Sequence, residues 1–188
     1  MREYKEELVG KQVGRGADCI VYQYADDSVI KFSTSSFFFG NLVRKKLHSD
    51  YLVCKKYLTD YVVTTEFIQG NKRFKHIEIQ PYISGRYLCL SDLSREKVTR
   101  QFREIAQSLE EMEDSGISPI DLIGAQGVLR MRLSNILIDE HDQLHIIDAT
   151  LFEAESFGWI KFLLNPMLFF IKINQAYIVR RFLERASV

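Results

Sequence analysis

The pattern of apolar residues changes about halfway along the chain, and this change constrains the fold more than any other feature. Residues 1–84 contain short runs of β-branched and aromatic residues separated by turn residues, a pattern typical of strands. Residues 85–188 contain a long stretch whose apolar residues recur every three or four positions, which is typical of an amphipathic helix. The sequence therefore predicts an α+β protein with two lobes, a mainly stranded lobe over 1–84 and a mainly helical lobe over 85–188.

The first lobe has a simple predicted order of elements. We expect strands over 20–24, 29–32, 62–68 and 74–82, and a helix over 37–48. The residues at 70–73 are a glycine followed by polar residues, which favours a hairpin turn between the last two strands. This order predicts an antiparallel sheet interrupted by one helix.

The second lobe is predicted from helical spacing and from one short hairpin. A helix that begins at Arg95 places one apolar stripe on a single face, formed by Val98, Phe102, Ile105, Ala106, Leu109 and Met112. Two short strands follow, over 135–138 and 144–147. We expect two closing helices separated near Pro166, because proline cannot continue a helix interior.

Composition limits the classes of partner and the compartment. The chain has 188 residues, with 25 Lys and Arg balanced by 25 Asp and Glu, so its formal net charge is zero. It offers no broad basic field for a nucleic-acid backbone, and we expect no nucleic-acid partner. Three cysteines without a CxxC spacing favour a reducing compartment. No apolar segment typical of a secretory signal follows the N-terminal residues, so we expect a cytoplasmic protein.

The most apolar segment, 157–173, contains Lys161, Pro166 and Lys172. A helix that spans a bilayer needs about 20 mostly apolar residues, so this segment is not expected to cross a membrane. Two interpretations remain: buried C-terminal helices, or a helix that contacts a partner protein or a membrane surface.

Two features of the first lobe are typical of a nucleotide site. Gly14 and Gly16 lie between predicted strands, where glycines let backbone amides approach a phosphate closely. Lys31 lies inside the apolar strand that follows, and a lysine there must reach water or meet an anion. A plain hairpin turn and a lysine at the sheet surface are the alternative interpretations.

Two oxygen-bearing side chains stand at corresponding places of the small hairpin in the second lobe. Asn135 opens its first strand and Asp148 follows its second, so both fall at the same end. An amide oxygen and a carboxylate that converge can hold Mg²⁺, which takes hard oxygen ligands and the phosphates of a nucleotide. A hairpin with ordinary polar ends is the alternative.

Together these segments resemble the protein-kinase-like superfamily over residues 9–150. The run GRGADCIVY is similar to the glycine-rich loop GxGxxGxV, with Cys19 in place of the third glycine, and SVIKF is similar to the VAIK strand. The resemblance implies that Gly14, Gly16 and Val21 cover a bound ATP. It also implies that Lys31 contacts the α- and β-phosphates.

The same resemblance extends to the hinge and to the metal site. The run IEIQPYISG is similar to the strand and hinge that meet adenine, which implies Gln80 as the gatekeeper and the backbone of Pro81 and Ile83 beside the base. The runs NILID and HIIDAT are similar to the paired metal-binding elements, with Ala149-Thr150 replacing Phe-Gly. They imply Asn135 and Asp148 as the ligands of Mg²⁺.

The catalytic base has two candidate positions. The family carries an aspartate five residues before the asparagine, and this chain has Arg130 there, which cannot act as a base. The run GISPIDL is similar to the segment that normally carries the aspartate. It implies Asp121 as the base, with an inserted loop over 123–132.

Two further departures concern the partner of Lys31 and the size of the second lobe. The predicted helix 37–48 contains no acidic residue, and the acids that follow it include Asp50 and Glu66. Either another acid pairs with Lys31, or Lys31 is positioned differently. Residues 149–188 are too few for an activation segment and the helices of a full C-lobe. The resemblance therefore implies a reduced, mostly helical C-lobe.

These features predict an ATP-dependent phosphotransferase that uses Mg²⁺, with Lys31 and Asp121 as catalytic residues. The acceptor would be a protein Ser/Thr or a small-molecule hydroxyl. The alternative is a pseudokinase that serves as a nucleotide-sensing or scaffold module, since Arg130 occupies the usual base position. A third interpretation is an α+β interaction domain that binds no nucleotide.

Overall fold

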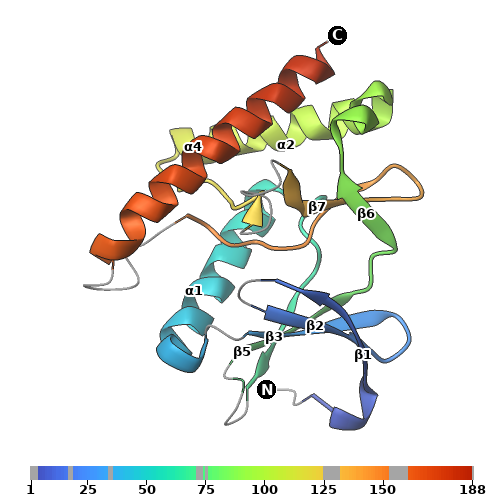
Figure 1. Ribbon diagram of the computed structural model, residues 1–188, viewed down its shortest axis with the longest axis vertical. Helices are drawn as coiled ribbons and strands as arrows, with labels where there is room; N and C mark the ends of the chain where they lie inside the picture. The colour runs from blue at the N-terminus through green and yellow to red at the C-terminus, as the bar shows by residue number, and fades with distance from the viewer. Residues whose placement is uncertain are drawn as a thin grey trace. The chain divides into compact units, whose positions relative to one another are not determined.

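A computed structural model describes residues 4–16, 19–33, 36–70, 74, 76–124, 132–152 and 161–187 (Figure 1). Contacts within the chain divide it into two compact units. The first unit comprises Met1–Tyr51 and Val63–Tyr82, and the second comprises Leu52–Val62 and Ile83–Val188. The domains predicted from the sequence, 1–84 and 85–188, stay a prediction.

The first unit contains a five-stranded antiparallel sheet in the order β1-β2-β3-β5-β4. Its strands are β1 (Val9–Arg15), β2 (Cys19–Tyr24), β3 (Ser28–Ser33), β4 (Glu66–Gln69) and β5 (His76–Pro81), and the 3-10 helix η1 (Glu6–Leu8) precedes them. The predicted antiparallel sheet is confirmed. Because β3 is the central strand, its residues have a hydrogen-bonded neighbour on both sides (Figure 1).

Alternation along β3 gives the sheet one apolar and one mixed face. Ile30 and Phe32 form a buried cluster with Ile68 and Ile77, and the ring of Phe32 meets those of Tyr4, Tyr22 and Phe74. Successive strand residues point to opposite faces. Lys31 therefore lies on the face opposite this core.

Helix α1 (Ser36–Tyr57) connects β3 to β4 and is longer than the predicted 37–48. Its residues up to Tyr51 belong to the first unit, where the rings of His48 and Tyr51 contact Phe67 of β4. Near its C-terminus, the Nζ atom of Lys55 donates to the backbone oxygens of Thr59 and Val62 at 2.8 and 2.9 Å. Lys55 thereby holds the segment that follows the helix against its last turn.

The second unit contains a three-stranded antiparallel sheet in the order β6-β7-β8. The predicted hairpin is present as β7 (Leu133–Asp139) and β8 (Leu144–Ile146), whereas the sequence did not predict β6 (Gly85–Leu88). Gly85 is required in β6, since a Cβ atom there would lie 2.6 Å from the backbone oxygen of Ile138.

Helix α2 (Glu96–Asp114) confirms the predicted amphipathic helix. All six residues of the predicted stripe are buried: Val98, Phe102, Ile105, Ala106, Leu109 and Met112. The helix is followed by Gly116, which adopts a φ of +73°. A left-handed residue at this place is a common way to end a helix.

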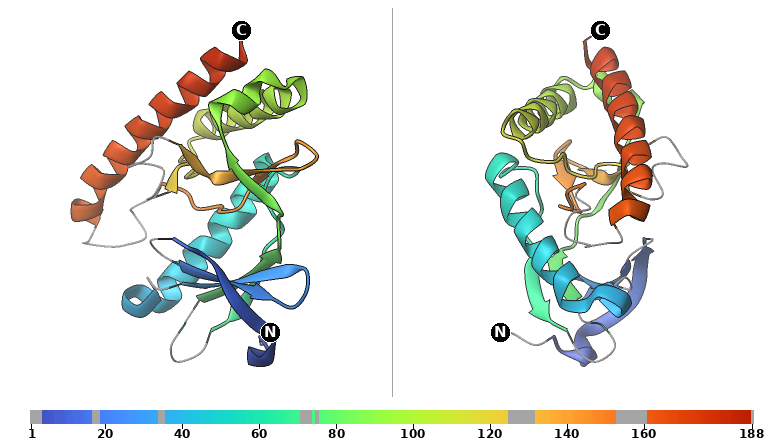
Figure 2. Two further views of the ribbon diagram at one scale, coloured as in Figure 1. Left: turned by 45° about the vertical axis from the view of Figure 1, so that its right-hand side comes forward. Right: turned by 90° about the vertical axis from the view of Figure 1, so that its left-hand side faces the viewer.

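The chain closes with one helix, α4 (Lys161–Ala186), which lies beside α2 (Figure 2). The prediction of two helices separated near Pro166 was wrong. Pro166 is the sixth residue of α4, so its missing backbone N–H removes one helical hydrogen bond, yet the helix continues through it. The ring centroids of Phe102 and Phe182 lie 5.3 Å apart, and this contact joins α2 to α4.

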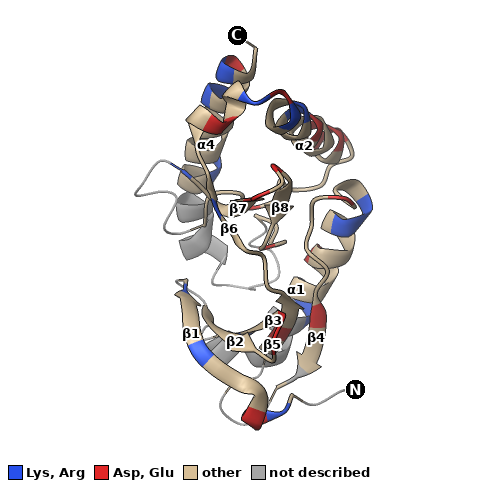
Figure 3. Ribbon diagram, turned by 90° about the vertical axis from the view of Figure 1, so that its right-hand side faces the viewer, with Lys and Arg blue, Asp and Glu red and all other residues tan. Residues whose placement is uncertain are grey.

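Part of the apolar segment 157–173 faces solvent. Phe169, Phe170 and Ile173 of α4 are 67%, 60% and 53% exposed, which contradicts burial for these residues. Residues 157–160 lie outside the described part. Among the described residues no helix has the length and apolar character to cross a membrane. Figure 3 shows both basic and acidic residues on α2, whereas the charged residues on the described part of α4 are basic apart from Glu184.

A buried carboxylate ties the start of α2 to β6. Asp92 lies in the 3-10 helix η2 (Leu90–Ser94), and its side chain is 5% exposed. It accepts hydrogen bonds from Arg86 at 2.7 and 2.5 Å, from Arg95 at 2.5 Å and from the backbone N–H of Cys89 at 2.8 Å. The bonds from Arg86 are the main cause of the lowered pKa of Asp92, and burial opposes them.

We expect Asp92→Asn to lower the free energy of unfolding at pH 7 by about 2–3 kcal/mol, because two arginines lose a buried charged partner. The pKa of Asp92 lies below its ordinary value of 3.8, so its stabilisation is present above about pH 4 and is lost as the pH falls through the folded value. The difference between variant and unmodified protein should therefore shrink in acid.

Urea unfolding between pH 2 and pH 7 measures both effects. Asp114→Asn, at an exposed residue at the end of α2, is the matched control and should stay within about 0.5 kcal/mol. Equal stability of the Asp92 and Asp114 variants at pH 7 would contradict this role of Asp92.

Candidate functional site

The predicted glycine-rich turn joins β1 to β2. Gly14 pairs with Val21 across the two strands, and the backbone N–H of Gly16 donates to the oxygen of Cys19 at 2.9 Å. The two residues between Gly16 and Cys19, which are Ala17 and Asp18, lie outside the described part. The described residues form a tight hairpin end, and contact with a phosphate there stays a prediction.

Lys31 of β3 has an acidic partner on the neighbouring strand. Strand register places it directly opposite Glu78 of β5, and its Nζ atom lies 4.0 Å from the Oε2 atom of Glu78. The two side chains are 12% and 17% exposed. The sequence pointed to Asp50 and Glu66, left another acid open as the partner and did not identify Glu78. An acid inside the apolar strand 77–79 was the available signal.

His76 holds the carboxylate of Glu78 from the other side. Its Nε2 atom lies 2.7 Å from Oε1 of Glu78, and the imidazole is almost fully buried. Among the described residues its Nδ1 atom has no hydrogen-bond partner. Burial raises the pKa of Glu78, but the hydrogen bond from His76 and the charge of Lys31 outweigh it, so the pKa lies below its ordinary value of 4.5.

The predicted hinge residues lie at the end of β5 and just beyond it. Gln80 is 5% exposed and donates from Nε2 to the hydroxyl of Thr65 at 2.8 Å. Pro81 is exposed, and the next residue, Tyr82, donates its backbone N–H to the oxygen of Asp27 at 2.7 Å. Ile83 belongs to the second unit. A contact between these residues and a base stays a prediction.

In the second unit, Asp121 and Asn135 are in direct contact. The side-chain amide of Asn135 donates from Nδ2 to the backbone oxygen of Asp121 at 2.8 Å. The Oδ1 atom of Asp121 accepts the backbone N–H groups of Ile123 and Gly124 at 3.0 and 2.7 Å. These bonds fix the turn after Asp121 and the orientation of its carboxylate. Arg130, the other candidate position for the base, lies outside the described residues.

Backbone hydrogen bonds join the Asp148 segment to the same cluster. The oxygen of Asn135 accepts the N–H of Ile147 at 3.0 Å, and the N–H of Asp121 donates to the oxygen of Thr150 at 2.7 Å. The hydroxyl of Thr150 donates to Oδ1 of Asp148 at 2.6 Å. The structure therefore gathers the three residues predicted for catalysis and metal binding in this unit around one set of backbone bonds.

A buried glutamine of α4 hydrogen-bonds to the residues on either side of Asp121. Gln175 accepts the backbone N–H of Leu122 at 2.7 Å and donates to the backbone oxygen of Ile120 at 2.8 Å. The strand-like bridge between Ile120 and Leu151 continues the connection. The turn that carries Asp121 is thereby held by hydrogen bonds from α4 and from the segment around Asp148.

The donor set fits the ligand preferences of Mg²⁺. Asn135 and Asp148 contribute an amide and a carboxylate oxygen, and Mg²⁺ is commonly held by one or two protein carboxylates together with substrate phosphates. Among the described residues no group of three or more His, Cys, Asp or Glu side chains could hold a metal by itself.

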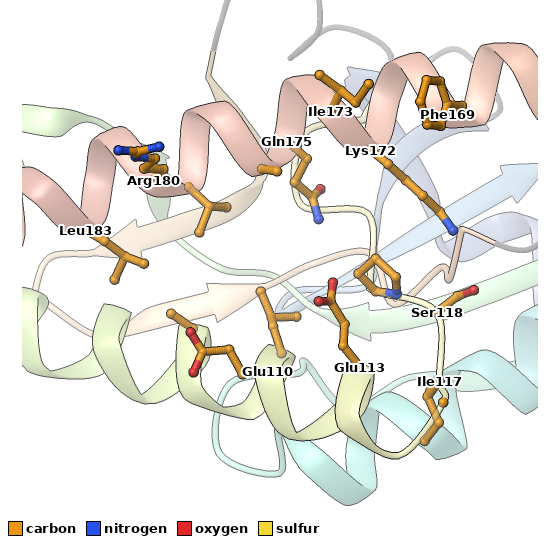
Figure 4. Close-up of a pocket in the computed structure, with 16 residues that line it drawn as sticks. Glu110, Glu113, Ile117, Ser118, Phe169, Lys172, Ile173, Gln175, Arg180 and Leu183 are labelled. Atoms are coloured by element: carbon orange, nitrogen blue, oxygen red, sulfur yellow. The ribbon is translucent and has the colours of Figure 1, made fainter.

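A pocket of about 730 Å³ lies elsewhere in the second unit, between α2 and α4. Glu110 and Glu113 of α2 and Lys172, Gln175 and Arg180 of α4 border it (Figure 4). None of the predicted site residues, all of which are described, lines this pocket. It adjoins the cluster around Asn135 through Gln175, which lines the pocket and also hydrogen-bonds to Ile120 and Leu122.

Comparisons with known proteins do not assign a function to the cluster around Asp121 and Asn135. No model of a known protein family matches the chain. No curated protein matches it either. The function must therefore be argued from the chain's own residues and their contacts.

Gly124 offers a test of the cluster, because it adopts a φ of +56° and a Cβ atom there would lie 3.1 Å from Oδ1 of Asn135. Gly116, with a φ of +73°, has nothing within 4 Å of such an atom and is the matched control. We expect Gly116→Ala to lower the free energy of unfolding by about 1–2 kcal/mol through backbone strain alone. Gly124→Ala should cost about 1 kcal/mol more, since Asn135 must move.

Urea unfolding of the two variants gives the comparison. Equal losses would show that the side chain of Asn135 is not held against Gly124.

Proposed function

We propose that the protein is an ATP-dependent phosphotransferase with a two-lobed, protein-kinase-like fold and a reduced C-lobe. The observation that carries the proposal is the hydrogen-bonded cluster of Asp121, Asn135 and the Asp148–Thr150 segment. A base candidate and two candidate metal ligands, separated in the sequence, are joined by a few backbone bonds. Such an arrangement is suited to positioning a phosphoryl donor and an acceptor.

The first unit supports the same proposal. A glycine-containing hairpin, a lysine on the central strand and a helix between β3 and β4 occur in the order that the resemblance implies. Lys31 carries a positive charge that is largely shielded from water, with an ionised carboxylate beside it. A shielded ammonium group interacts more strongly with a phosphate than an exposed one does.

In the proposed reaction, the acceptor hydroxyl oxygen attacks the γ-phosphorus of ATP. A new P–O bond forms, the bond to the β,γ-bridging oxygen breaks, and ADP leaves. Lys31 binds the α- and β-phosphates, and Asn135 and Asp148 would hold Mg²⁺, which neutralises phosphate charge when bound. Asp121 orients the acceptor hydroxyl and takes its proton. The acceptor is a protein Ser/Thr or a small-molecule hydroxyl.

One observation favours a second candidate, a pseudokinase. Oδ1 of Asp121 already accepts two backbone N–H groups, which is the pattern of a carboxylate that stabilises a turn. A protein in which Asp121 only fixes the turn would bind nucleotide and transfer nothing. Mg-ATP binding without any phosphorylated product, in the presence of protein and sugar acceptors, would identify this alternative.

We expect Mg-ATP to raise the melting temperature of the protein. Ligand at 100 times its Kd stabilises the folded state by about 2.7 kcal/mol, which corresponds to about 5–10 °C for a chain of this length. Lys31→Ala should abolish the shift, whereas Lys11→Ala, at an exposed lysine of β1, should retain it. Absence of any shift at millimolar Mg-ATP would favour an interaction domain that binds no nucleotide.

Asp148→Asn tests the metal ligand without disturbing its local hydrogen bond, because an amide oxygen can still accept from Thr150. We expect ADP release in the presence of Mg-ATP to fall by at least about 100-fold, since one charged ligand of the metal is lost. Glu140→Gln, an exposed change in the β7–β8 turn, is the control for the loss of one negative charge. Normal turnover by the Asp148→Asn protein would contradict the assignment.

A further inference from the structure

Three ionisable side chains form a row on the mixed face of the sheet in the first unit. His76 and Glu78 are two residues apart on β5 and therefore point to the same face, and Lys31 lies opposite Glu78 on β3. Glu78 is in the middle, 2.7 Å from Nε2 of His76 and 4.0 Å from Nζ of Lys31. Each carboxylate oxygen therefore has its own partner.

The two acids named from the sequence, Asp50 and Glu66, are placed differently. Asp50 of α1 forms a buried ion pair with Lys46, one helical turn before it. Glu66 lies opposite Ile79 on the neighbouring strand, so its side chain is on the other face of the sheet from Lys31. Glu78 is thus the described acid that strand register directs toward the ammonium group.

The contacts of Glu78 within the sheet keep its carboxylate ionised. The lowered pKa of Glu78 keeps the carboxylate ionised at neutral pH, although burial alone would raise that pKa. The buried His76 contacts the ring of Phe67 at 5.7 Å and donates to Oε1, which limits the rotation of the Glu78 side chain. At 4.0 Å the two side chains of Lys31 and Glu78 form an ion pair and not a direct hydrogen bond.

We propose that Glu78, oriented by His76, is the residue that positions the Lys31 ammonium group for the phosphates of the nucleotide. The proposal rests on the proposed function. Its basis is the cross-strand register, which sets the distance between the two side chains. The pair therefore forms whenever β3 and β5 are paired, and it does not depend on an acid from α1.

Binding of Mg-ATP and of adenosine, each measured by calorimetry, separates positioning from folding. Glu78→Gln should weaken Mg-ATP binding at least ten-fold and leave adenosine binding within two-fold, because adenosine has no phosphate to meet Lys31. Glu78→Asp keeps the charge on a shorter side chain and should fall between the unmodified protein and Glu78→Gln. Glu66→Gln, on the opposite face, is the matched control and should leave both affinities unchanged.

A double-variant cycle assigns the effect to Lys31. In the Lys31→Met protein, Glu78→Gln should weaken Mg-ATP binding no further, because the residue that Glu78 positions is gone. Equal losses for Mg-ATP and adenosine, or additive losses in the cycle, would overturn the role of Glu78 while nucleotide binding stands. Failure of the unmodified protein to bind Mg-ATP would overturn the proposed function itself, and this role with it.

Discussion

The pairing of β3 with β5 is the constraint on which the first unit depends. Because these strands are neighbours, their apolar side chains form the buried cluster around Ile30 and Ile77 on one face. The same register places Lys31 opposite Glu78 on the other face. A shift by one residue would reverse both faces at once. The packing of the core therefore fixes the strand register, and the register places Lys31 beside Glu78 without any further interaction.

In the second unit, the candidate site residues are positioned by main-chain hydrogen bonds and not by strand register alone. The central bonds of this unit are made by main-chain groups: Asp121 bonds to Thr150, which is distant in the sequence, and Asn135 bonds to Ile147 across the β7–β8 hairpin. Main-chain bonds of this kind tolerate little movement, because a buried N–H or C=O left without a partner is costly. Gln175 extends the network to α4. The candidate ligands are thus attached to rigid backbone, as a site that works by positioning requires.

Local patterns were enough to predict much of the fold. The stripe on α2, the β7–β8 hairpin and the strand around Lys31 follow from spacing alone. The partner of Lys31 was not predicted, because the acid within strand 77–79 becomes its neighbour only when β5 lies beside β3, and local patterns do not determine strand order. The helix through Pro166 was missed because a proline that removes one hydrogen bond can bend a helix without ending it. Asn135 and Asp148 were predicted as a pair, but the bonds that bring Asp121 to them are non-local.

A crystal structure with Mg²⁺ and a non-hydrolysable ATP analogue tests the central claim most directly. We predict the α- and β-phosphates within hydrogen-bond reach of Nζ of Lys31, and the metal bound by oxygens of Asn135 and Asp148. An analogue bound away from these three side chains, or a metal held by other residues, would contradict the account.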